Sequence, residues 1–169
     1  MAEITVERES NARSIDWSAA VWAGIVAGIV FMMMEMILAP MFGGAPSIWA
    51  PPRMIAAIGM GQQVLPPPAD FALGPIMVAM VIHFMLSITF GIVTAFIVRN
   101  LSTGAAVLVG IVLAVLLYVL VFYLMTPVWP WFANARGWVS IVAHIAFGAV
   151  VGWWYRARAK SLDEHRVVT

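Results

Sequence analysis

The stretch AMVIHFMLSITFGIVTAFIVR, residues 79–99, decides the fold of this chain. It is long and apolar enough to cross a bilayer as a helix, and it ends on an arginine. Small residues and one histidine recur in it every fourth position, a spacing that places them on one helix face. They are Ala79, His83, Ser87, Gly91 and Ala95. A membrane-buried imidazole is costly unless the bundle interior uses it, so His83 is the first candidate site residue.

A second stretch, SIVAHIAFGAVVGWWYR at residues 140–156, repeats this design. It places Ser140, His144, Gly148 and Gly152 at the same four-residue spacing and leads into Arg156. The sequence therefore predicts two histidine-bearing membrane helices with matching small-residue faces.

Composition places the whole chain in a membrane. Of 169 residues, 63% are hydrophobic and 10% are charged, and the mean hydropathy is +0.98. A soluble domain of this length cannot bury so much apolar surface. The formal net charge of +1 argues against a nucleic-acid partner. The absence of cysteine excludes disulfides, thiolate metal clusters and a cysteine nucleophile. Nucleotide-binding and hydrolase motifs are also absent, so we do not expect an enzyme.

The expected fold is all-α, a bundle of four transmembrane helices. The helices are expected at about 17–38, 73–98, 104–125 and 138–155, the first ended by Pro40. Polar tails are expected at 1–16 and 156–169, and proline- and tryptophan-rich loops at 40–72 and 126–137. A segment from about Pro52 to Gln63, opened by two prolines, is expected to form a short interfacial helix.

The distribution of basic residues predicts that both termini are cytoplasmic. Seven lysines and arginines fall on the side of the termini and the 99–103 turn, against two, Arg53 and Arg136, on the other side. The seven are Arg8, Arg13, Arg99, Arg156, Arg158, Lys160 and Arg166. By the positive-inside rule, both long loops are external. The order of elements also suggests two helical hairpins that repeat in the same direction.

A carboxylate is expected to join the two histidines. Glu35 lies about three turns beyond Gly24 and therefore shares the face of the Gly24/Gly28 pair. At ~1.5 Å per residue, the external helix ends lie roughly 15 Å from His83, 9 Å from His144 and 6 Å from Glu35. We expect all three in one externally biased pocket, joined by Tyr118 or Tyr123, with the histidines no more than ~15 Å apart.

Several chemistries fit this set. Two imidazoles and a carboxylate can bind zinc, copper or iron, and they can also pass protons. Two histidines on facing helices can ligate haem b axially. The plainer interpretation is packing, with each histidine bonded to a carbonyl or tyrosine across helices. A related alternative is a non-catalytic accessory subunit or homo-oligomer that docks through its small-residue faces. The methionine run at 31–36 is read as hydrophobic filling, because consecutive side chains point around the helix.

The chain resembles the YagU-type family of small bacterial inner-membrane proteins. The resemblance rests on AGIVAG (23–28), HFMLSITFG (83–91), FYLMTPVWPWFAN (122–134) and VAHIAFGAVVGWW (142–154). It implies a multi-pass protein of the inner membrane with a link to acid-stress resistance and no defined biochemical activity. It also implies that His83 and His144 match the family's histidines in the second and fourth helices.

Overall fold

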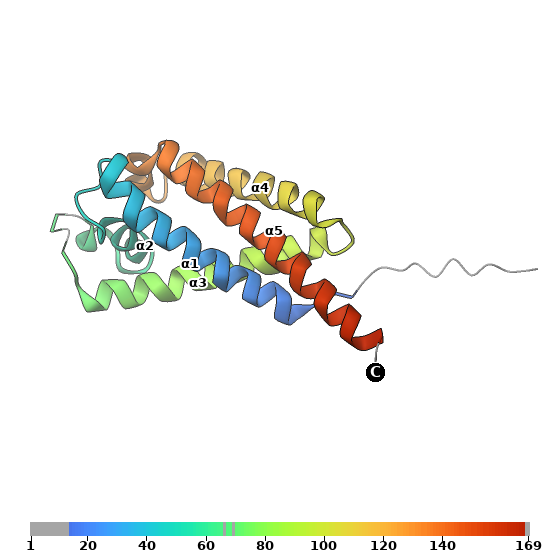
Figure 1. Ribbon diagram of the computed structural model, residues 1–169. Coiled ribbons are helices and arrows are strands. Elements are labelled where there is room, and N and C mark those ends of the chain that lie inside the picture. The colour runs from blue at the N-terminus through green and yellow to red at the C-terminus, as the bar shows by residue number, and fades with distance from the viewer. Residues whose placement is uncertain (1–13, 66, 69, 168–169) are drawn as a thin grey trace, which may run out of the picture.

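The structure, a computed structural model, describes residues 14–65, 67–68 and 70–167. Within these residues it is all-helical, with four helices long and apolar enough to cross a membrane, which confirms the expected class of fold (Figure 1). The elements are α1 (Trp17–Phe42), α2 (Ala50–Met60), η1 (Gln62–Val64), α3 (Leu73–Val98), α4 (Thr103–Val119), η2 (Leu120–Leu124), η3 (Pro130–Ala135) and α5 (Trp138–Val167). Residues 1–13 of the expected N-terminal tail, which include Arg8 and Arg13, lie outside the described residues.

The four spanning helices form two hairpins, α1 with α3 and α4 with α5. The first helix of each hairpin begins at a side-chain cap. Asp16 accepts a hydrogen bond from the backbone N–H of Ala19 at 2.8 Å. Ser102 accepts one from the N–H of Ala105 at 3.3 Å. Each cap satisfies one of the N–H groups that have no partner within the first turn of a helix.

Two helices run further than the sequence indicates. The expectation that Pro40 ends the first helix is wrong, because α1 continues to Phe42 with Pro40 in its last turn. A proline so close to the end removes a single hydrogen bond, and the N–H of Gly43 still bonds to the carbonyl of Ala39 at 2.8 Å. α5 continues to Val167 through residues expected to lie in a tail.

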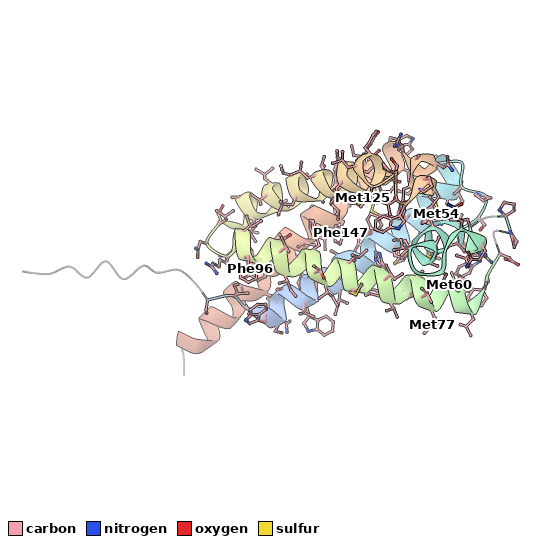
Figure 2. The ribbon with its side chains drawn as sticks, turned by 180° about the vertical axis from the view of Figure 1, so that it is seen from behind. Met54, Met60, Met77, Phe96, Met125 and Phe147 are labelled. Atoms are coloured by element: carbon pink, nitrogen blue, oxygen red, sulfur yellow. The ribbon has the colours of Figure 1, made fainter. Side chains whose placement is uncertain are left out.

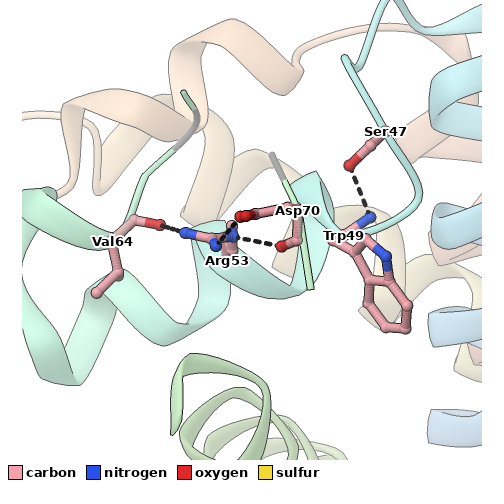
Figure 3. A network of polar contacts seen from close by, with 5 residues as sticks. All are labelled: Ser47, Trp49, Arg53, Val64 and Asp70. Atoms are coloured by element: carbon pink, nitrogen blue, oxygen red, sulfur yellow. Dashed lines mark hydrogen bonds and ion pairs between the residues drawn. The ribbon is translucent and has the colours of Figure 1, made fainter. Parts of the chain in front are cut away.

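The short helix α2 lies at one end of the bundle, and its Arg53 binds the segment that follows it. Arg53 is only 5% exposed, and its guanidinium donates to the carbonyls of Val64 and Asp70 at 3.1 and 3.0 Å. It also pairs with the Asp70 carboxylate at 2.6 Å (Figure 3). The two prolines after Ala50 occupy the first turn of the helix, where no N–H is needed. The segment after α2 is thereby tied back onto it.

The helices are arranged in the order α4, α5, α1, α3 across the bundle. α1 and α5 pack along each other in the middle, and α3 and α4 lie on opposite sides of this pair (Figure 1). α3 and α4 are joined by a short turn but touch at few positions. The turn lies at the same end as the start of α1 and the end of α5, while α2 and the long loops lie at the other end (Figure 1).

Small residues bring the helices of each hairpin into backbone contact. A Cβ on Gly91 of α3 would lie 2.6 Å from the carbonyl oxygen of Ala20, and a Cβ on Gly24 of α1 would lie 2.5 Å from that of Ser87. In the second hairpin, a Cβ on Gly152 of α5 would lie 2.7 Å from the carbonyl carbon of Ala106. Such distances leave no room for a side chain, so glycine sets how closely the helices approach.

The contacts of the two hairpins recur at constant offsets in the sequence. Ala20, Gly24 and Gly28 of α1 correspond to Ala106, Gly110 and Ala114 of α4, each 86 positions later. His83, Ser87 and Gly91 of α3 correspond to His144, Gly148 and Gly152 of α5, each 61 positions later. The capping residues Asp16 and Ser102 also differ by 86.

Candidate functional site

A cavity of about 1120 Å³ lies inside the bundle, towards the end that carries α2. All of the spanning helices contribute to its lining, and α2 and the loop before α5 close it at one end. Few polar side chains line it, and those contributed by the spanning helices include Glu35, His83, Ser87, Ser140 and His144. Aromatic and aliphatic side chains form most of the remainder. Figure 2 shows one of them, Phe147, between the ribbons of α3 and α4.

The structure brings the three predicted site residues to the lining of this one cavity. Glu35, His83 and His144 are 7%, 6% and 4% exposed, so none of them points towards lipid. Glu35 lies seven residues before the end of the longer α1, roughly 10 Å deep at the helical rise. It is therefore deeper than the sequence-based boundary suggested.

Phe31 of α1 packs against both imidazole rings. Its ring centroid is 5.8 Å from that of His83 and 4.8 Å from that of His144. The separation of the two imidazoles therefore cannot exceed the sum of 5.8 and 4.8 Å, which is within the expected limit. Phe31 also meets the ring of Phe147 at 5.8 Å.

Backbone carbonyls define which ring nitrogen of each histidine carries a proton. The Nε2 of His83 lies 2.9 Å from the carbonyl oxygen of Gly28, and the Nδ1 of His144 lies 2.7 Å from that of Ser140. Because a carbonyl only accepts, each of these nitrogens donates. No hydrogen bond among the described residues engages the other nitrogen of either ring.

Ser140 lies next to both the carboxyl group and one of the histidines. Its side chain is beside that of Glu35, and its backbone carbonyl accepts a hydrogen bond from His144. The Oε1 atom of Glu35 is buried and has no hydrogen-bond partner among the described residues. Burying a carboxyl oxygen without a hydrogen bond costs free energy, unless a bound ligand or a proton on the carboxyl group supplies the missing partner.

The two expected tyrosines do not act alike. Tyr118 is buried, and its ring lies 5.4 Å from that of His144. Tyr123 is 48% exposed, and its ring lies under the guanidinium of Arg136 at 4.4 Å. Tyr118 therefore packs against His144, and Tyr123 packs against Tyr118 and Arg136, but neither tyrosine is among the residues that line the cavity.

The arrangement does not favour metal or haem. Among the described residues, no group of three or more histidine and carboxylate side chains is positioned to hold a metal ion. A haem ligated by both histidines would occupy the space that the Phe31 ring fills, since that ring contacts both imidazoles. The Nε2 of His83 is also already bonded to Gly28.

Sequence reasoning missed the aromatic residues that complete the site. Phe31 lies one turn before Glu35, and Phe147 lies three residues after His144, so both share a face with a predicted site residue. That spacing could have identified them. It also missed that Ser140 lies beside Glu35, although Ser140 lies one turn before His144.

These observations define a multi-pass helical membrane protein with an internal cavity. We call the polar part of its lining that carries Glu35, Ser140 and His144 the base of the cavity. Comparison of the chain with protein-family models, with curated proteins and with solved structures finds no match. The resemblance to YagU-type proteins therefore stays a prediction.

Proposed function

We propose that this protein binds a largely apolar organic molecule in its cavity and handles protons at the Glu35–Ser140–His144 group. The observation that carries the proposal is the buried, unpartnered Oε1 of Glu35 in the lining of a large apolar cavity. Binding sites for small molecules are typically apolar cavities of several hundred to about 1,000 Å³ with a few placed polar groups. Ionisable groups inside membrane spans commonly mark substrate or proton paths.

Two groups at the base can hold or release a proton, the Glu35 carboxyl group and the Nε2 of His144. Ser140 lies beside Glu35, and its backbone carbonyl fixes the His144 ring by accepting from Nδ1. The Nε2 of His144 is thereby left as the nitrogen that can accept a proton. His83, bonded to Gly28 and stacked on Phe31, forms the wall beside them.

The alternative of an accessory subunit loses its main support. The small-residue faces on which docking to a larger complex was expected are occupied by the chain's own helices. Gly24, Gly28 and Gly91 pack in the α1–α3 contact, and Gly148 and Gly152 pack in the α4–α5 contact. The proposal places the chain in the bacterial inner membrane with both termini cytoplasmic, as the arginine distribution and the family resemblance indicate.

We also infer that the two hairpins are internal repeats. The constant offsets of 86 and 61 positions, which relate backbone contacts, histidines and helix caps, support this inference. A parallel repeat of this kind implies a pseudo-twofold axis along the membrane normal. α1 then corresponds to α4 and α3 to α5. The packed α1–α5 contact and the sparse α3–α4 contact, which the axis would relate, are not alike, so the repeat extends to each hairpin and not to the docking of the two.

Cysteine labelling tests whether the cavity binds organic molecules. The chain has no cysteine, so Ser140→Cys introduces a single thiol at the base with almost no change in size. We expect a small methanethiosulfonate reagent to label it in neutral-detergent micelles. Triphenylphosphine oxide, tetraphenylphosphonium or tetraphenylborate should slow that labelling saturably.

The matched control is Ser18→Cys, which places a thiol on the exposed face of α1 away from the cavity. Its labelling should not respond to the three probes beyond their effect on the micelle. If position 140 does not label, or if none of the three probes protects it, the proposed function is wrong.

A further inference from the structure

The charge at the base of the cavity narrows the class of ligand. Among the described lining residues, Glu35 is the one acidic side chain, and Arg136 is the one lysine or arginine. Arg136 is engaged elsewhere, because it donates to the carbonyl of Phe122 and to Thr126 and lies over the Tyr123 ring. The carboxyl group of Glu35 thus has no cationic partner in the described part of the chain.

Aromatic rings line the cavity on both sides of Glu35 along α1. Phe31 and Phe147 meet at 5.8 Å, and Phe90 lies 4.9 Å from Phe147. On the other side of Glu35, Phe42 lies 5.8 Å from Trp138. All five rings line the cavity. Aromatic faces attract organic cations, and the attraction grows when water is excluded.

The cavity also has an apolar opening between α3 and α4. Leu86 of α3 and Leu120 of η2 line the cavity and are nevertheless 54% and 43% exposed. Both belong to segments apolar enough to span the membrane. Because α3 and α4 touch at few positions, the side of the cavity between them faces the hydrocarbon region.

We propose that the ligand is a lipophilic organic cation that enters from the bilayer between α3 and α4 and takes the Glu35 carboxylate as its counter-ion. This inference rests on the proposed function of the cavity and names the ligand class. An anion would face an uncompensated carboxylate at the base, whereas a cation gains both the carboxylate and the aromatic faces. A bulky cation with delocalised charge loses little hydration on leaving the bilayer interface.

A proton and the cation then compete for one carboxyl group. Binding of the cation releases the proton of Glu35 to solvent, and protonation releases the cation. Ser140 lies beside Glu35, and the other titratable or charged side chains among the described residues that line the same cavity are His83 of α3, His144 of α5 and Arg136. The described lining residues of α2, α4 and η2 carry no titratable side chain. Affinity for a cation should therefore rise with pH.

A pair of probes of equal shape and opposite charge tests the ligand class. Tetraphenylphosphonium and tetraphenylborate share four phenyl groups on a central atom and differ in the sign of the charge. In dodecyl maltoside micelles, equilibrium dialysis should show preferential binding of the phosphonium ion by about tenfold or more, growing with pH. Glu35→Gln should abolish the preference while leaving protection of position 140 by triphenylphosphine oxide in place.

Equal binding of the two ions, or a preference that survives Glu35→Gln, would overturn the inference. The proposed function would still stand if the neutral probe protected position 140. If no probe bound at all, both would be wrong, so the two failures are distinguishable.

The route of entry is tested by narrowing the opening. The double variant Leu86→Trp/Leu120→Trp places two large side chains on its opposite walls. The control, Leu108→Trp/Leu116→Trp, adds the same bulk to exposed leucines of α4 that do not line the cavity. In phosphatidylcholine nanodiscs, the first pair should slow association of tetraphenylphosphonium severalfold and the second should not. Equal association rates in both variants would contradict entry between α3 and α4.

Discussion

Substitution of Gly91 by alanine tests how closely the first hairpin is packed. The added Cβ would lie 2.6 Å from the carbonyl oxygen of Ala20 and 2.9 Å from the nitrogen of Gly24, whereas ordinary contact begins at 3.4 Å. Both neighbours are backbone atoms of α1 and cannot rotate away. The two helices must therefore separate by about 0.8 Å, the difference between 3.4 and 2.6 Å.

The expected loss of stability follows from that displacement. Forcing one extra carbon into a packed interior typically costs about 1–3 kcal/mol. Alanine's higher helix propensity offsets about 0.5–1 kcal/mol of this. The control is Gly74→Ala in the first turn of α3, where no atom lies within 4 Å of the added carbon. That variant should be as stable as the parent or slightly more stable.

Reversible unfolding in mixed micelles with increasing dodecyl sulfate, followed by circular dichroism, measures both variants. A parent-like midpoint for Gly91→Ala, or an equal loss in Gly74→Ala, would refute the packing argument. Gly152→Ala occupies the equivalent position of the second hairpin, where the Cβ would lie 2.7 Å from the carbonyl carbon of Ala106. Its loss of stability should be at least as large as that of Gly91→Ala, because the added carbon lies even closer to the carbonyl oxygen it meets.

Two further predictions concern the ends of the bundle. Arg53→Gln removes the bonds to Val64 and Asp70, so amide hydrogen exchange in residues 61–65 should accelerate while that of α1 stays unchanged. Asp70→Asn should accelerate this exchange less, because the bonds from Arg53 to the backbone carbonyls of Val64 and Asp70 remain. Equal acceleration in the two variants would contradict the role given to these carbonyls. Asp16→Ala and Ser102→Ala should each lower the free energy of unfolding by about 0.5–2 kcal/mol, the former more because its bond is shorter, 2.8 against 3.3 Å. Thr89→Ala removes a hydrogen bond within one exposed helical turn and serves as the control, which should leave the free energy of unfolding unchanged.

The sequence predicts the spanning helices well because their pattern is local. Length, hydropathy and turn residues were sufficient to place a helix at Leu73–Val98 and a short helix from about Pro52 to Gln63, which the structure has at Ala50–Met60. The predicted end of α1 was wrong because a proline stops a helix only where the loss of its hydrogen bond and its steric clash disrupt further turns. Pro40 lies in the last turn, where no further turn follows. Local rules cannot tell these two cases apart.

The candidate site was partly predictable for a related reason. Four-residue spacing places Glu35, His83 and His144 on buried faces without any knowledge of their partners. The partners themselves depend on which helices are neighbours. α1 carries two adjacent small-residue faces, and only the structure shows that Ala19, Ala23 and Ala27 share a buried cluster with residues of α5. That contact brings Phe31 against His144, which spacing alone does not reveal.

The central position of α1 and α5 has a consequence for how the chain is made. In the described part of the chain, α1 comes before the other spanning helices and α5 comes after them, so their contact can form only once α3 and α4 have been made. Each hairpin already has its own close backbone contact, α1 with α3 and α4 with α5. Insertion can therefore yield two preassembled halves that dock last, as expected where helices insert first and associate afterwards. Two polypeptides separated within the 99–103 turn should still find each other in the bilayer and rebuild the cavity between them.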